Sequence, residues 1–254
     1  MVQPVQDPAA ALVAEDHAFA DLLRGADLTT PVPTCPGWTL QQLLRHLGRG
    51  HRWAAQIVRE RRDTALDPRQ VEDGKPPPDD DGARAWVARG GQVLLDAVSG
   101  TGPETPVWTF LGPRPAAWWI RRRLHETTVH RADAAIALGL PYEIPAPLAA
   151  DAVSEWIELV VAEPGPGGRG ERAVDPGASL HLHATDTDAE WTLRGTGEGT
   201  TFEPSHAKAT TALRGPASDL LLAVSGRRRI ADTAIELFGD EAVWHRFTER
   251  TPLS

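Results

Sequence analysis

The segment from His125 to His130 contains a carboxylate and an imidazole four residues apart, Glu126 and His130. Residues with this spacing in an α-helix lie about 40° apart around the axis and one turn apart along it. Glu126 and His130 would therefore point to the same side of a helix, with Asp133 on the same stripe. Because imidazole and carboxylate groups are zinc ligands, the spacing predicts a metal site on this helix.

The same segment differs by one residue from the zinc-protease motif His-Glu-x-x-His. Its histidines, His125 and His130, are five residues apart and would face different sides of a helix. A catalytic zinc ion usually has three protein ligands and an open position, so a third ligand must come from elsewhere. His46 and His51 are the candidates, and hydrophobic periodicity does not choose between them. The alternative for each is a buried, hydrogen-bonded histidine.

Four amphipathic helical patterns occupy the first half of the chain. They cover about residues 8–24, a segment that begins at Thr39, and about residues 82–98 and 115–138. Thr39 and Gln42 fit a capping box, and Gly139 follows the last pattern. Residues 67–81 are rich in proline and aspartate, which predicts an exposed connection. Four such helices predict a bundle, in which facing helices can supply metal ligands.

The pattern changes after about residue 147, where short alternating runs appear. The predicted elements are a helix at 148–161, an antiparallel hairpin at 179–184 and 190–194, a strand near 209–213, and helices at 217–224 and 229–238. A glycine- and proline-rich tract, Glu163–Gly170, interrupts them. We therefore predict a mainly α protein with an α+β C-terminal part: a four-helix bundle over residues 1–146 and a small α+β domain over residues 147–254.

Three motifs together resemble one known family. They are Val32-Pro33-Thr34-Cys35-Pro36-Gly37-Trp38-Thr39 followed by His46, then His125-Glu126-x-x-x-His130-Arg131-x-Asp133, and finally Leu213–Leu220 followed by Gly226-Arg227. This set is similar to the mycothiol-dependent maleylpyruvate isomerase family. In that family a DinB-like four-helix bundle binds a divalent metal, usually zinc, through His, Glu and His, and a small C-terminal domain follows. The resemblance implies that His46, Glu126 and His130 are the metal ligands.

The resemblance also implies a thiol-dependent reaction. In the family's reference reaction, mycothiol adds to the cis double bond of maleylpyruvate, the resulting single bond rotates, and elimination gives fumarylpyruvate. A metal with an open position lowers the pKa of the group that binds there, so a bound thiol would become a thiolate. The expected cofactors are zinc or another divalent metal, and mycothiol or a similar low-molecular-weight thiol.

Four further residues are predicted to serve this site. An acidic substrate needs a cationic partner, for which the resemblance favours Arg227, with Arg123 as second choice. Asp133 could accept a hydrogen bond from a ligand histidine, with a local salt bridge as the alternative. Trp119 lies two turns before Glu126 on nearly the same side of the helix, so we expect it to line the cavity in which the thiol binds.

The remaining candidates for chemistry have simpler interpretations. His181 and His183 would share one face of the predicted hairpin, but the sequence places no third ligand near them. We therefore expect an exposed hairpin face there rather than a second metal site. Cys35 is the single cysteine and is expected to be a packing residue.

Composition limits the class of protein. The chain has 254 residues and a formal net charge of −9, which argues against nucleic acid as its main partner. Apolar residues make up 41% but never form the run of about twenty that a membrane span needs. The first residues lack the basic and apolar stretches of a secretion signal, and one cysteine suits a reducing compartment. These features predict a cytoplasmic monomer or homodimer whose partners are small molecules.

Three functions follow from these observations. The first is a metal-dependent enzyme that uses a thiol for isomerisation or S-transfer on a small, electrophilic and acidic substrate. The second is a metal-dependent hydrolase that uses bound water, and the third is a non-catalytic binding or carrier protein. His46, Glu126 and His130 together argue against the third, since a carrier does not need all three. The resemblance favours the first.

Overall fold

The computed structural model describes residues 5–162 and 172–251. The chain divides into two compact units, one of residues 6–142 and one that begins at Glu143. The predicted glycine- and proline-rich tract begins at Glu163 and lies outside the described residues. Among the described residues, no helix has the length and apolar character needed to cross a membrane.

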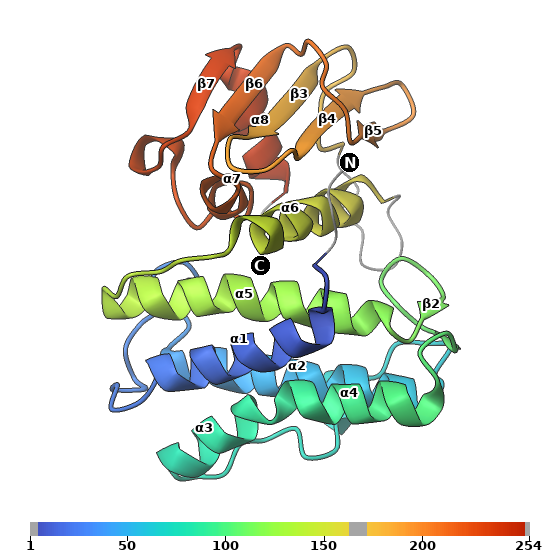
Figure 1. The fold of residues 1–254 in the computed structure, drawn as a ribbon, viewed down its shortest axis with the longest axis vertical. Coiled ribbons are helices and arrows are strands. Elements are labelled where there is room, and N and C mark those ends of the chain that lie inside the picture. Colours follow the sequence, from blue (N-terminus) through green and yellow to red (C-terminus); the bar gives the residue numbers. More distant parts are fainter. Residues whose placement is uncertain (1–4, 163–171, 252–254) are drawn as a thin grey trace. The chain divides into compact units, whose positions relative to one another are not determined.

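The first unit is the predicted helical bundle. Its helices are α1 (Pro8–Leu22), α2 (Leu40–Arg59), α3 (Asp80–Ala88), α4 (Gly90–Thr101) and α5 (Trp118–Leu138), with a short ribbon of β1 (Pro106–Val107) and β2 (Arg114–Pro115). Helix α1 packs along α5, and α2 packs against both α4 and α5 (Figure 1). Their inward faces form an apolar core around Phe19, Leu43, Leu47 and Trp86. This arrangement brings α2 and α5, which carry the predicted ligands, side by side.

Residues 82–98 form two helices, α3 and α4, rather than the single helix predicted. The break has a tertiary cause, because buried Asp16 on α1 accepts a hydrogen bond of 2.7 Å from the Gly91 amide in the first turn of α4. A Cβ atom at Gly90 would lie 2.5 Å from Cδ2 of His51. Two consecutive glycines therefore let the start of α4 approach both side chains closely.

The start of α2 agrees with the sequence prediction. Thr39 and Gln42 form the predicted capping box: the Thr39 side chain accepts from the Gln42 amide, and the Gln42 side chain accepts from the Thr39 amide at 2.8 Å. In the preceding loop the Val32 amide donates to the Trp38 carbonyl at 2.9 Å. This hydrogen bond closes the loop, so Thr34, Cys35 and Trp38 lie directly before the helix that carries His46.

The second unit contains the predicted α+β arrangement. Its elements are α6 (Ala146–Val161), β3 (Ser179–Ala184), β4 (Glu190–Gly195), β5 (Thr200–Glu203), β6 (Thr211–Gly215), α7 (Ala217–Val224), β7 (Glu236–Gly239) and α8 (Glu241–Arg250). The sheet has the order β5-β4-β3-β6-β7, in which only β3 and β6 run parallel. Strands β3 and β4 form the predicted hairpin.

The helix predicted at residues 229–238 is wrong. Those residues form a short 3-10 helix, Ile230–Asp232, followed by β7. Phe238 pairs with Ala212 and Leu237 with Leu213, along the edge of β6 opposite β3. Pairing with a neighbouring strand overrides the local helical pattern, because strand formation depends strongly on tertiary context.

The two faces of this sheet differ in character. Leu180, Leu182, Trp191 and Leu193 lie on one face and are fully buried, and Trp191 donates a hydrogen bond of 2.9 Å to Ser154 on α6. The opposite face carries the alternate residues of β3 and β4, which are His181, His183, Glu190 and Thr192. The period of two along each strand thus separates an apolar face from a polar one.

Candidate metal centre

Three side chains from two helices converge inside the first unit. Glu126 and His130 lie one turn apart on α5, and His46 comes from α2. Oε1 of Glu126 is 3.7 Å from Nε2 of His46 and 3.6 Å from Nε2 of His130. One ligand atom from each of the three residues lies within 4.8 Å of the others. The structure therefore brings together the three residues that the sequence predicted as metal ligands.

Arginine holds the second oxygen of Glu126. Arg122, one turn earlier on α5, pairs through Nη2 with Oε2, and Nη1 of Arg123 lies 4.0 Å from the same oxygen. Burial would raise the pKa of Glu126, but Arg122 and the two imidazoles hold it well below its usual value. The carboxylate is therefore ionised, with Oε1 directed toward the histidines.

His130 is oriented by a second carboxylate. Its Nδ1 lies 2.8 Å from Oδ2 of Asp133, whose other oxygen accepts a hydrogen bond of 2.5 Å from Thr34. Burial would lower the pKa of His130, but hydrogen bonds with Asp133, Cys35 and Glu126 raise it to about 10. With Nδ1–H donating to Asp133, Nε2 faces Glu126, and a metal ion bound there would displace the Nε2 proton that the raised pKa retains.

His46 presents a buried nitrogen at a partly open position. Its side chain is 39% exposed, yet its Nε2 is buried and has no hydrogen-bond partner among the described residues. Burial lowers the pKa of His46, so the neutral form is favoured. The ring of Trp38 packs beside it, with centroids 5.0 Å apart, and lies 6.4 Å from the His130 ring. A neutral imidazole with an unpaired nitrogen is suited to bind a metal.

The three residues fit a divalent metal ion. Ligands at about 2.0–2.1 Å in a tetrahedral zinc site lie about 3.3 Å apart, slightly closer than the two nitrogen–oxygen distances here. A second group, Cys35, His130 and Asp133, also has its polar atoms close together. Both Asp133 oxygens in that group already accept hydrogen bonds, from Thr34 and from Cys35. The group of His46, Glu126 and His130 is therefore the better ligand set.

Sequence comparison identifies the family. The profile of the mycothiol maleylpyruvate isomerase N-terminal domain matches residues 9–135, and that of the MDMPI C-terminal domain matches residues 147–246. The chain belongs to the mycothiol maleylpyruvate isomerase family. No curated protein sequence matches it.

Two solved structures resemble this member of the mycothiol maleylpyruvate isomerase family. They are crystal structures of the mycothiol-dependent maleylpyruvate isomerase and of its histidine-to-alanine mutant, with TM-scores of 0.62 and 0.63. Each is 13% identical to this chain, and each comparison covers 92% of this chain and 93% of the other. At this identity the likeness establishes the fold alone.

The structure also decides between the two histidines of α2. His51 is fully buried, with Nε2 3.0 Å from Oδ1 of Asp16, and its Nδ1 accepts a hydrogen bond of 3.4 Å from Arg123. Both of its nitrogens therefore have partners within the core. His125 is also buried and lies outside the group around Glu126. His46 is thus the histidine of α2 that faces Glu126 in this family member.

Two other predicted site residues lie in the same unit. Arg123 is only 6% exposed and donates to His51 and to the Leu47 carbonyl. Trp119 is 1% exposed, donates to the Trp108 carbonyl at 3.1 Å and packs in an aromatic cluster with Trp53, Trp108, Phe110 and Trp118. A contact of Arg123 with substrate, and of Trp119 with the thiol, stays a prediction.

Arg227 lies in the second unit, at the end of α7. The Arg227 amide donates to the Leu222 carbonyl and the Gly226 amide to the Ala223 carbonyl, which is a Schellman motif. Gly226 has a φ of +72°, a conformation that glycine adopts without strain. The Arg227 side chain is buried, and Nη1 donates to the Ser225 carbonyl at 2.6 Å. The Gly-Arg pair is thus a helix stop that holds the arginine in one orientation.

Sequence reasoning did not assign roles to Thr34, Trp38 and Arg122. All three contact the ligand set or its partners: Thr34 through Asp133, Trp38 through the His46 ring, and Arg122 through Glu126. Arg122 could have been found from its spacing, because it precedes Glu126 by four residues. Thr34 and Trp38 belong to the quoted family motif, but only the folded loop places them beside α5.

Replacing Asp133 by asparagine should weaken metal binding at this centre. The uncharged amide is a poorer acceptor for Nδ1 of His130, and loss of such a partner typically costs about 10- to 100-fold in metal affinity. Competition with a zinc indicator would measure the change, with the exposed Asp96→Asn variant as control. Equal zinc affinity in a folded Asp133→Asn protein would contradict this positioning role.

Proposed function

We propose that this protein is a metal-dependent enzyme that uses mycothiol or a similar low-molecular-weight thiol. Its reaction is isomerisation or S-transfer on a small, electrophilic and acidic substrate, as in maleylpyruvate isomerase. The observation that supports the proposal is the convergence of His46 and His130 on one oxygen of Glu126. Family membership favours a thiol over water as the reacting group.

His46, Glu126 and His130 would hold the divalent metal, for which zinc is our assignment. When bound, it would lower the pKa of a thiol, and a thiolate attacks electrophilic carbon far better than a thiol does. Arg122 and Asp133 would keep Glu126 and His130 in place. Trp38 packs beside both imidazoles, with ring centroids 5.0 Å from His46 and 6.4 Å from His130.

The proposed isomerisation needs only the thiolate and the substrate, because the thiolate is regenerated. The thiolate sulfur forms a bond to one carbon of the cis double bond as the π electrons move toward the conjugated carbonyl group. The remaining carbon–carbon single bond rotates. The sulfur–carbon bond then breaks, which restores the double bond in the trans form and regenerates the thiolate.

We assign the first domain to residues 1–146 and the second to residues 147–254, with a cytoplasmic location and a monomeric or homodimeric state. In this assignment Arg227 from the second domain, with Arg123 as the alternative, binds an acidic group of the substrate. A guanidinium pairs with a carboxylate through two parallel hydrogen bonds, which gives orientation as well as affinity.

Arg227→Ala should lower kcat/KM for an acidic substrate by about 10- to 100-fold, since a hydrogen bond to a charged group contributes about 1.5–3 kcal/mol. Metal content should not change. Arg228, its exposed neighbour, provides the matched control as Arg228→Ala. Because Arg227 is buried, circular dichroism of each variant and recovery of activity in Arg227→Lys would separate substrate binding from folding. Unchanged kcat/KM in folded Arg227→Ala would exclude this role.

The experiment that tests the proposed function is an activity assay on zinc-loaded and chelator-treated protein. Maleylpyruvate is supplied with mycothiol, with another thiol or without thiol, and the trans product is followed by absorbance. Zinc- and thiol-dependent turnover of maleylpyruvate, or of another acidic electrophile in a substrate screen, is the expected result. Turnover of ester or amide substrates without thiol would support the hydrolase instead. Absence of turnover across the screen would favour the carrier.

A further inference from the structure

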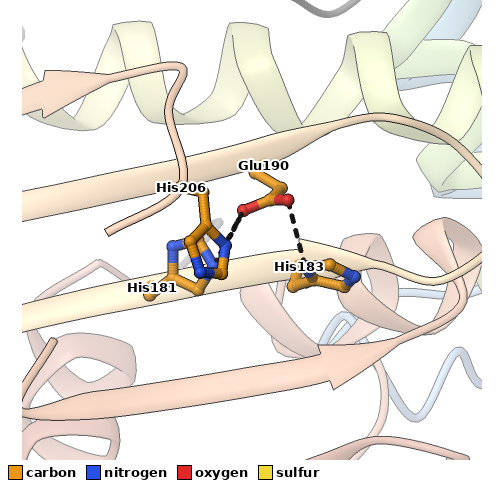
Figure 2. Close-up of side chains that lie close together, drawn as sticks. All are labelled: His181, His183, Glu190 and His206. Carbon is orange, nitrogen blue, oxygen red and sulfur yellow. Dashed lines mark hydrogen bonds and ion pairs between the residues drawn. The ribbon is translucent and has the colours of Figure 1, made fainter. Parts of the chain in front are cut away.

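A second cluster of potential ligands lies on the polar face of the sheet in the second unit. It consists of His181 and His183 on β3, Glu190 on β4 and His206 between β5 and β6, with their side chains directed toward one another (Figure 2). One ligand atom from each lies within 4.8 Å of the others. The prediction that no third ligand lies near His181 and His183 is therefore wrong.

Strand register places three of these residues together. His181 is opposite Thr192 and His183 is opposite Glu190 in the β3–β4 hairpin. Residues two apart on a strand share a face, so His181, His183 and Glu190 project from the same patch. This part of the cluster follows directly from the pairing of the hairpin.

Sheet topology supplies the fourth residue. Strand β5 lies at one edge and β6 lies beyond both β4 and β3, so the connection between them must cross those two strands. Hydrogen bonds from Thr192 to the Ser205 carbonyl at 2.8 Å and from the Ser179 amide to Thr210 at 3.1 Å fasten this connection to the polar face. His206 lies in the middle of the crossing and reaches the patch.

The distances suit a tetrahedral ligand set. Oε2 of Glu190 is 2.6 Å from Nδ1 of His206 and 3.2 Å from Nε2 of His181, and Oε1 is 3.3 Å from Nδ1 of His183. Four ligands at about 2.0–2.1 Å from one zinc ion would lie about 3.3 Å apart. The Glu190 distances lie near this value, and one ligand atom from each of the four residues lies within 4.8 Å of the others.

Hydrogen bonding determines which nitrogen of His181 faces the cluster. Thr192 donates its only hydroxyl proton to the Ser205 carbonyl, so at 3.1 Å it must accept from Nδ1 of His181. In neutral His181 this arrangement leaves a lone pair on Nε2. His181 is 4% exposed, and its Nε2 makes no hydrogen bond with any described residue, although the Glu190 carboxylate lies beside it. Two facing acceptors repel one another unless a cation lies between them.

We propose that His181, His183, Glu190 and His206 form a closed zinc site. Three imidazoles and one carboxylate match the ligands that zinc prefers, and four protein ligands without an open position are typical of a structural site. The metal would fasten the β5–β6 connection to β3 and β4. The metal would order the His206 side chain most, because this side chain is 76% exposed and pairs with Glu190 alone among the residues that the structure describes.

Zinc stoichiometry in the full-length protein tests the proposal. In a His46→Ala background, which disables the bundle centre, chelator-treated protein reloaded with zinc should retain about one equivalent per chain. Adding His206→Ala or Glu190→Gln should lower the affinity for that zinc ion by about 100-fold or more. Losing a residue that only hydrogen-bonds to a ligand already lowers metal affinity by about 10- to 100-fold, and a ligand should matter more. His245 is an exposed histidine on α8, so adding His245→Ala should leave zinc content and zinc affinity unchanged. Cobalt in place of zinc should give the absorption of a tetrahedral complex.

Protection of the crossing segment provides a second measurement. Zinc should slow amide exchange in residues 204–210, and His206→Ala should abolish that difference. Absence of zinc from the His46→Ala protein, or equal zinc affinity after His206→Ala and Glu190→Gln, would overturn the proposal. If His206→Ala removes one equivalent of zinc and His46→Ala removes none, this site is supported and the metal centre in the bundle is contradicted. The same experiment therefore distinguishes failure of one proposal from failure of the other.

Discussion

His46→Ala and His130→Ala should each remove one metal equivalent per chain and reduce thiol-dependent turnover by at least about 100-fold. Each substitution removes one of the three ligands, and the metal contributes several kcal/mol to the reaction through the thiolate that it stabilises. Metal analysis by mass spectrometry and the thiol-dependent assay would measure both effects. The measurement is cleanest in a His206→Ala background, where the second cluster is disabled.

Two histidines provide controls for this result. His17→Ala alters an exposed side chain on α1 and should leave metal and turnover unchanged. His51→Gln should retain the metal in folded protein, because His51 bonds to Asp16 and Arg123 rather than facing Glu126. Full metal content in His46→Ala, or its loss in folded His51→Gln, would show that the ligand from α2 is assigned incorrectly.

Asp16→Ala should lower the free energy of unfolding by about 3–5 kcal/mol, the range for breaking a buried charged interaction. The fully buried carboxylate of Asp16 accepts from the Gly91 amide at 2.7 Å and from Thr127 at 3.1 Å, and lies 3.0 Å from Nε2 of His51. Alanine would leave these buried groups without their common partner and remove the cap of α4.

Urea unfolding of the metal-free protein, followed by far-ultraviolet circular dichroism, would measure this loss. Asp21→Ala is the matched control, because Asp21 is an exposed aspartate on the same helix with a surface arginine partner. Surface pairs of this kind contribute about 0–1 kcal/mol. An Asp16→Ala protein as stable as the control would contradict the role of Asp16 as a buried link between α1, α2 and α4.

Short-range features of the site could be predicted because they depend on helix geometry. Glu126 and His130 share a face of α5 through their spacing, Asp133 continues that face, and the capping box at Thr39 starts α2 where the pattern indicated. The alternating residues of β3 and β4 likewise predicted their hairpin. In each case the interacting groups lie within one helix turn or within one hairpin, so local backbone geometry determines their contact.

Predictions failed where distant segments compete with local preference. The third helical pattern divides at Gly90 because Asp16 caps a new helix there, and residues 236–239 pair with β6 instead of extending a helix. Periodicity could not separate His46 from His51, since both occupy the same helix. Packing separates them: Asp16 binds His51 within the core, whereas His46 faces α5.

The sequence by itself predicted the two-part architecture, the family and the shared face of Glu126 and His130 on α5, because those depend on periodicity and on motifs read along the chain. The family motif implied His46, but only the tertiary structure shows that it lies beside Glu126 and His130. Only the structure, too, places Thr34 and Trp38 next to these residues and brings His206 across the sheet to His181 and Glu190. Those contacts join residues far apart in sequence. Their proximity depends on which helices and strands pack together, and spacing along a chain carries no information about that.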